Sequence, residues 1–111
     1  MKPQTALTPD QMHELQSLGL DCSDASMCWC QEPNEEECRL FIHDEYCYEA
    51  ACLHPIPAYT LEDILMKLPK YLYGKELKVT KTEVSYQYLH YCRGYTLMRN
   101  AFEVLKWVLE N

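Results

Sequence analysis

The sequence predicts one α+β domain over residues 1–111, with a mostly antiparallel sheet of about four strands and about three helices in the order α-β-β-α-β-β-α. Three observations predict this class. Two segments carry complete helix-start signals, the last segment has apolar residues at helical spacing, and the segments between them alternate apolar and polar residues. A chain of 111 residues is close to the commonest size of a single domain.

The first helix is predicted from Pro9 to Leu18. Thr8 is a suitable N-cap residue, Pro9 fits the first helical position, and Gln11 completes a capping box with Thr8. Gly19 suits a left-handed helix stop.

Two strands follow in the prediction, from Ala25 to Gln31 and from Glu37 to His43, because apolar residues recur there with a period of two. The Pro-containing segment between them predicts a hairpin turn. Asp44 to Ala58 shows no sustained period, so we expect a connecting loop with a short extended piece at 51–53.

A second helix begins after Thr60 and ends or kinks at Pro69, which removes a backbone donor. Lys75 to Lys81 and Val84 to Cys92 predict two further strands, although the weak turn signal between them leaves one long bent strand over 76–92 open. The last helix runs from about Leu97 to the end. Its wide apolar face indicates either the central helix of the domain or part of a dimer interface.

Charge is unevenly distributed along the chain, whose net charge is −7. Residues 1–55 have a net charge of −9 and residues 56–111 a net charge of +2. A net negative field repels nucleic acid, so we expect no nucleic-acid partner. No apolar run approaches the ~20 residues that cross a bilayer, so we expect no membrane association and a cytoplasmic protein. The seven cysteines are then expected to be reduced thiols, most of them in the core.

Neither an enzyme nor a cofactor is predicted. The chain has no P-loop, no dinucleotide-binding glycine motif and no nucleophile elbow, and no catalytic residue is assigned. A small zinc module is an alternative, since thiolates and imidazoles are zinc ligands, although Cys-x-x-Cys pairs are absent. Its ligands would be Cys28, Cys30, Cys38 and His43.

Protein binding is the leading functional hypothesis, through a protein partner or through self-association as a homodimer. Aromatic side chains give large rigid contact areas, which makes them good interface residues. The candidates are Tyr86, Tyr88, Phe102 and Trp107. A second alternative is an acidic decoy that imitates nucleic-acid phosphates and occupies a nucleic-acid-binding protein. Its carboxylates would be Glu32, Glu35, Glu36, Glu37, Asp44, Glu45 and Glu49.

Several segments resemble those of small uncharacterised proteins of gut bacteria and of their prophages and mobile elements. They are the helix start at Thr8, the Ser26-Met27-Cys28-Trp29 segment, the segment from Ala58 to Pro69, and the ending from Ala101 to Asn111. The resemblance spans most of the chain, but its motifs are caps and core residues. It implies an accessory protein of mobile-element origin and assigns no site residue.

Overall fold

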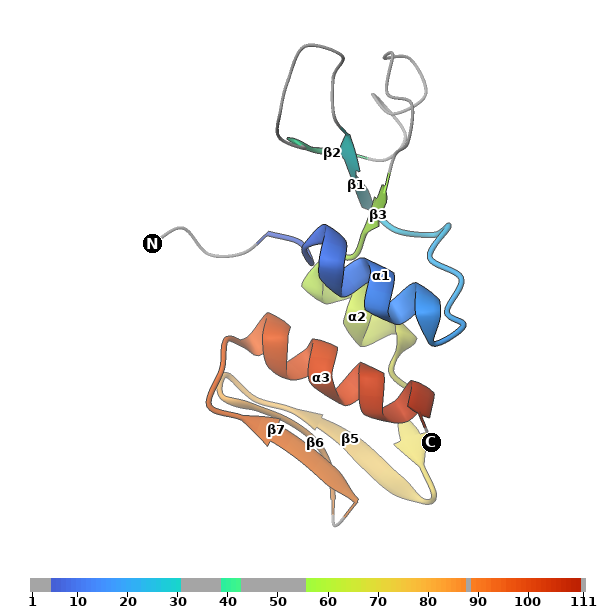
Figure 1. The fold of residues 1–111 in the computed structure, drawn as a ribbon. Coiled ribbons are helices and arrows are strands. Elements are labelled where there is room, and N and C mark those ends of the chain that lie inside the picture. Colours follow the sequence, from blue (N-terminus) through green and yellow to red (C-terminus); the bar gives the residue numbers. More distant parts are fainter. Residues whose placement is uncertain (1–4, 31–38, 43–55, 88, 111) are drawn as a thin grey trace. The chain divides into compact units, whose positions relative to one another are not determined.

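The computed structural model describes residues 5–30, 39–42, 56–87, 89–110 of the chain. Over these residues it contains three helices and seven short strands (Figure 1). The chain divides into two compact units, Met1–Thr60 and Leu61–Asn111. Each unit has its own sheet, of three and four strands, and every strand pair is antiparallel. The α+β class is therefore confirmed, with more strands than the four expected.

Helix α1 (Pro9–Ser17) opens the first unit with the predicted capping box. The Thr8 hydroxyl accepts a hydrogen bond from the Gln11 backbone N–H at 3.2 Å. The Gln11 side-chain oxygen in turn accepts one from the Thr8 backbone N–H at 3.0 Å. These bonds satisfy two donors that a helix start leaves free. Met12 and Leu15 are fully buried, so the narrow apolar stripe of the helix faces the core.

The sheet of the first unit has the order β2-β1-β3, with β1 (Met27–Cys30) between β2 (Arg39–Ile42) and β3 (Ile56–Ala58). The predicted hairpin is confirmed by the pairing of β1 with β2. Strand β3 is a correction, because the sequence predicts a loop there. Pro57 is compatible with β3 because the strand lies at an edge of the sheet. The outer side of an edge strand pairs with no other strand, so a missing backbone N–H on that side costs no hydrogen bond.

Tyr59 connects the parts of the first unit. Its carbonyl accepts the Leu7 amide hydrogen at 2.9 Å, and its hydroxyl donates to the Asp24 carboxylate at 2.9 Å. The Trp29 indole N–H donates to the Leu7 carbonyl at 2.7 Å. Since Tyr59 and Leu7 are completely buried, these bonds fix the segment before α1 against the sheet.

The second unit begins with α2 (Leu61–Lys67), which ends two residues before Pro69. Four strands follow as a meander in the order β4-β5-β6-β7. Their bounds are β4 (Tyr71–Leu72), β5 (Lys75–Val79), β6 (Glu83–Tyr86) and β7 (His90–Arg93). The prediction of one strand from Val84 to Cys92 is wrong, as is one long strand over 76–92. Tyr86 pairs with His90 across a tight turn, so this segment folds back on itself.

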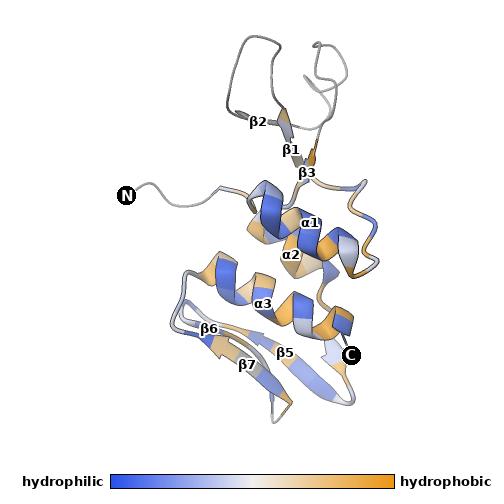
Figure 2. Cartoon of the chain, viewed as in Figure 1, coloured by the Kyte–Doolittle hydropathy of each residue, from blue (hydrophilic) through white to orange (hydrophobic). Residues whose placement is uncertain are grey.

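Helix α3 (Leu97–Glu110) closes the second unit and is its central layer. It contacts β6 and β7 on one side and α2 on another (Figure 1). This position explains the wide apolar face that the sequence shows, because the helix needs cover from two directions. Hydrophilic residues interrupt the hydrophobic ones along α3 (Figure 2). Within the part of the chain that the structure describes, no helix is long and apolar enough to cross a membrane.

Candidate functional site

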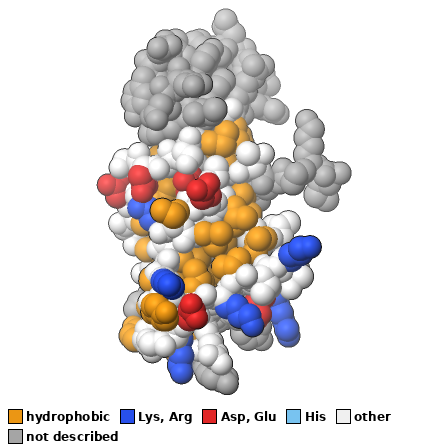
Figure 3. Space-filling model, turned by 180° about the vertical axis from the view of Figure 1, so that it is seen from behind, with side chains coloured by type: hydrophobic (Ala, Val, Ile, Leu, Met, Phe, Trp, Pro, Cys, Tyr) orange, Lys and Arg blue, Asp and Glu red, His pale blue; other side chains and the backbone are white. Residues whose placement is uncertain are grey.

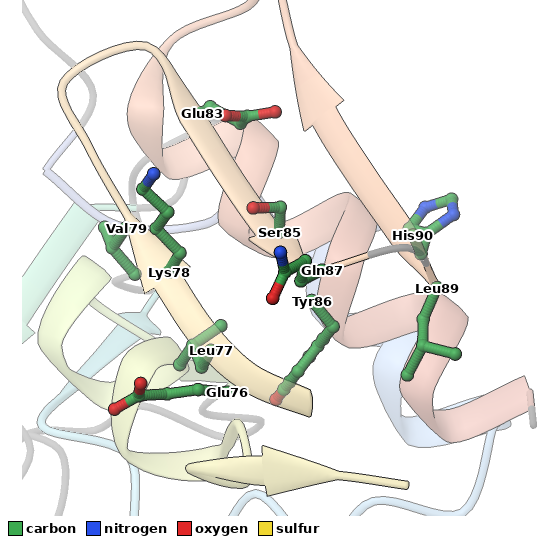
Figure 4. Close-up of a pocket in the computed structure, with 10 residues that line it drawn as sticks. All are labelled: Glu76, Leu77, Lys78, Val79, Glu83, Ser85, Tyr86, Gln87, Leu89 and His90. Atoms are coloured by element: carbon green, nitrogen blue, oxygen red, sulfur yellow. The ribbon is translucent and has the colours of Figure 1, made fainter. Parts of the chain in front are cut away.

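A hollow lies in the sheet of the second unit, on β5, β6 and the turn that leads into β7 (Figure 4). Its volume is about 1030 Å³. The side chains that give it polar character are Glu76, Lys78, Glu83, Ser85 and Gln87. Because the hollow combines these polar groups with apolar lining side chains, we take it as the candidate site.

Strand register decides which lining residues belong to which face of the sheet. Cys92 pairs with Val84, and the Cys92 thiol donates to the Asn100 side-chain oxygen of α3 at 3.5 Å. Val84, Tyr86, His90 and Cys92 therefore face α3, because residues two apart and residues directly opposite share a face. Ser85 and its β5 partner Lys78 lie on the other face, which α3 leaves uncovered.

Tyr86 is a buried residue of the α3 side. Its hydroxyl donates to the Pro69 carbonyl at 2.6 Å, and burial raises the pKa of this phenol to about 12. At neutral pH the hydroxyl is therefore protonated and donates its hydrogen to the Pro69 carbonyl. Tyr86 therefore fixes the chain after α2 against β6.

His90 also faces α3. Its imidazole stacks on the Trp107 indole with ring centroids 4.8 Å apart and planes 7° from parallel. Ser85 and His90 are nearby in the sheet, yet their side chains leave opposite faces. A nucleophilic hydroxyl needs a base within hydrogen-bond reach, and this register separates the two groups.

The face opposite α3 offers hydrogen-bonding groups of both charges. Lys78 lies between the carboxylates of Glu76 and Glu83 in the lining, and among the described residues no ion pair joins Lys78 to either one. The exposed Gln87 amide adds a neutral donor and acceptor, whereas Ser85 beside it is buried, with 8% of its surface exposed. Figure 4 shows Ser85 and Gln87 side by side on β6 and its end. Such a surface suits recognition of another polar surface.

Of the four aromatic residues predicted as contacts, Tyr86 and Phe102 are 1% and 2% exposed. They are core residues in the structure, because each side chain is already covered by its own unit. Trp107 is half-buried in the stack with His90. Tyr88 lies outside the described residues.

The predicted zinc ligands are only partly described. Cys28 and Cys30 are buried on one face of β1 with their sulfur atoms 3.6 Å apart, while Cys38 and His43 lie outside the described residues. Cys28 is disulfide-bonded, so the prediction of a reduced thiol is wrong there, and a disulfide sulfur is not a thiolate ligand. Cys22, Cys30 and Cys92 form no disulfide bond. No group of three or more metal-ligating side chains converges in the part that is described.

The acidic decoy hypothesis depends on carboxylates between residues 32 and 49, all of which lie outside the described residues. Apart from Tyr86, the residues that line the hollow were missed as a site by sequence reasoning. The alternation that separates Lys78 from Leu77, and Ser85 from Val84, was the available signal. It shows two faces but does not show which face a helix covers.

Comparison with known proteins gives no relative from which a role could be transferred. No family model matches the chain, and no curated protein or solved structure matches it. Fold and site together define an α+β protein whose second sheet is covered by a helix on one face and carries a hollow of mixed polar and apolar lining on the other.

Proposed function

We propose that this chain is a non-enzymatic protein that acts by binding another protein, and that the partner contacts the hollow over β5 and β6. The observation that carries the proposal is the face of this sheet that α3 leaves uncovered, where the exposed residues Glu76, Lys78 and Gln87 present polar groups around a hollow of about 1030 Å³. The accessory role in a mobile element, which the sequence resemblance implies, belongs to the same proposal.

The arrangement favours binding over catalysis. The lining groups that most often transfer protons, the Tyr86 hydroxyl and the His90 imidazole, are held on the α3 side by Pro69 and Trp107. The accessible groups that remain on the open face are the Gln87 amide, the Lys78 ammonium and the carboxylates of Glu76 and Glu83. These groups form the polar contacts typical of protein interfaces.

The charges around the hollow favour a protein partner over a nucleic acid. Two carboxylates, Glu76 and Glu83, accompany the single ammonium group of Lys78. Phosphate groups would be repelled by the carboxylates, whereas a protein surface can match both signs. The partner surface we expect is therefore polar and of mixed charge.

Photo-crosslinking in the cells that make the protein tests this proposal. A benzophenone amino acid is placed at Gln87, which is exposed and lines the hollow, or at Glu62, which is exposed on α2. We expect one protein species to crosslink at position 87 and not at position 62. Crosslinks of equal yield at both positions, or none at position 87, would contradict the proposal.

A further inference from the structure

Strand β7 is an edge of the second sheet, because among the described strands it pairs with β6 alone. The opposite edge is β4, which is only two residues long. Very short strands protect a sheet edge from pairing with another chain, and so do Pro, Lys or a bulge within the strand. Strand β7 has four residues in continuous register with β6 and contains no Pro or Lys. Its one permanently charged residue, Arg93, is the last.

The strand register shows which backbone groups of β7 point outward. The Thr80 N–H donates to the Glu83 carbonyl at 2.8 Å, so the backbone groups of Glu83 point toward β5. Backbone groups alternate in direction along a strand, so those of Val84 point toward β7 and meet those of its partner Cys92. The residues of β7 whose N–H and C=O groups point away from β6 are therefore Tyr91 and Arg93.

A second copy of the chain fits this edge. Two β7 strands that pair antiparallel are related by a two-fold axis, so the same edge serves both copies. With the axis beside Cys92, Tyr91 of one copy lies opposite Arg93 of the other. These are the residues whose backbone groups point outward, so hydrogen bonds form in both directions and the two sheets become one.

The two α3 helices then lie at packing distance on the same face of the joined sheet. Helix α3 lies over both β6 and β7, so its axis is about one strand spacing from the two-fold axis (Figure 1). Neighbouring strands are about 4.8 Å apart, which places the two helix axes about 10 Å apart. Packed helices are about 8–10 Å apart. Edge pairing and helix packing are therefore compatible in one dimer.

The flank of α3 beside β7 carries charges that complement those of a second copy. Arg99 lowers the pKa of the Cys92 thiol and Glu103 raises it, so both charged groups lie near this residue of β7. They are one turn apart on the helix. The two-fold axis reverses the direction of the second helix. Arg99 of each copy therefore faces Glu103 of the other.

Both charged side chains are already held in place. The Arg99 guanidinium lies over the Tyr95 ring, 4.2 Å from its centre, and a stacked guanidinium keeps its N–H groups available at its edge. Glu103 is 4.0 Å from the Lys106 ammonium, a separation that leaves the carboxylate able to accept closer hydrogen bonds.

The overall charge of the second unit does not oppose self-association. Residues 61–111 include eight basic and six acidic side chains, a net charge of +2. On the face drawn in Figure 3, Lys and Arg side chains lie near Asp and Glu side chains, so neither sign forms a continuous patch. Two copies of this unit therefore repel each other only weakly.

We propose that β7 is an interface between two copies of this chain, which pair edge to edge and antiparallel about a two-fold axis and place their α3 helices side by side. Every residue that forms this interface belongs to the second unit. The hollow lies over the other face of the sheet, so the interface goes beyond the proposed function and does not depend on it.

Sedimentation velocity over a wide range of protein concentration tests the edge pairing. Arg93→Pro removes an N–H that points away from β6, so the monomer should keep its circular dichroism spectrum while the dimer loses one hydrogen bond in each copy. Arg93→Ala is the matched control, because it removes the same side chain and keeps the N–H. We expect the dimer dissociation constant of Arg93→Pro to be at least about tenfold above that of Arg93→Ala.

A charge exchange on α3 tests the helix contact in the same measurement. Arg99→Glu places carboxylates opposite each other at both Arg99–Glu103 contacts, so the dimer dissociation constant should rise at least about tenfold. Adding Glu103→Arg to this variant restores opposite charges across the axis. The double variant should therefore dimerise more tightly than Arg99→Glu alone.

The expected result is a monomer–dimer equilibrium for the wild type and for Arg93→Ala. A wild type that is monomeric at all concentrations would overturn the proposal, and so would a folded Arg93→Pro that dimerises as tightly as Arg93→Ala. If Arg93→Pro does not fold, the charge exchange decides, because a double variant no tighter than Arg99→Glu contradicts the interface. Crosslinking at position 87 reports on the hollow alone, so either proposal can fail without the other.

Discussion

The Asn100 side-chain amide of α3 donates a hydrogen bond to the Thr82 carbonyl at 3.2 Å. Asn100 is completely buried and also donates to the Tyr95 carbonyl at 3.3 Å. One polar side chain therefore joins the β5–β6 turn to the start of α3. This link helps to hold α3 on its face of the sheet.

Replacing Asn100 by Leu should destabilise the second unit by about 1–3 kcal/mol, because two carbonyls lose a buried donor. Urea unfolding followed by circular dichroism measures the loss. Arg99→Gln, a change at the neighbouring exposed position, should cost much less. Equal stability of Asn100→Leu and the wild type would show that these bonds contribute nothing.

Replacing Thr8 by Ala should cost about 1 kcal/mol of stability, since the Gln11 amide hydrogen loses its acceptor at the start of α1. Thermal unfolding measures the effect, with Thr5→Ala as the matched control at an exposed position before the cap. The capping assignment fails if the two variants unfold at the same temperature.

Alkaline pH should destabilise the fold through Tyr86. Its pKa is about 12 in the folded state against about 10 in the unfolded chain, so the unfolded state ionises first as the pH rises. The stabilisation that comes from the raised pKa of Tyr86 is complete below pH 10. Between about pH 10 and 12 the folding equilibrium constant falls by about tenfold per pH unit, so this stabilisation is lost. Burial also raises the pKa of Tyr59, which adds to the effect.

Chemical denaturation at a series of pH values measures this dependence. Tyr86→Phe should lose stability less steeply than the wild type above pH 10. Parallel curves for the two proteins would contradict the assignment of the raised pKa to Tyr86.

The Cys92 thiol should react slowly with iodoacetamide. Burial raises its pKa, and the nearby Glu103 carboxylate raises it further, whereas Arg99 lowers it. We expect Glu103→Gln to speed alkylation and Arg99→Gln to slow it, because only the thiolate reacts. Mass spectrometry of the Cys92 peptide gives the rates, with the urea-unfolded protein as the reference for full access. An unchanged rate in both variants would refute the electrostatic explanation.

Local signals in the sequence predict much of this fold. The α1 capping box, the β1–β2 hairpin, the end of α2 before Pro69 and the course of α3 all follow from cap residues and spacing. These features depend on residues within a few positions of one another. Sequence reasoning is reliable there because the interactions are themselves local.

Features that depend on distant partners were missed. Strand β3 forms only because β1 offers a pairing edge, and the short β4 forms only through β5. The turn after Tyr86 lacks Gly or Pro, so the sequence reads as one strand through residues that fold back. The hollow was missed because its existence depends on which face of the sheet α3 covers. No local pattern specifies that choice.

The central claim is that the uncovered face of this sheet is a binding surface, and a pair of charge reversals tests it most directly. Lys78→Glu changes the ammonium group that lines the hollow, whereas Lys81→Glu makes the same change in the neighbouring turn, outside the lining. Titration against the partner crosslinked at position 87 should show affinity at least about tenfold lower for Lys78→Glu and unchanged for Lys81→Glu. Equal affinity of both variants and the wild type would contradict the account.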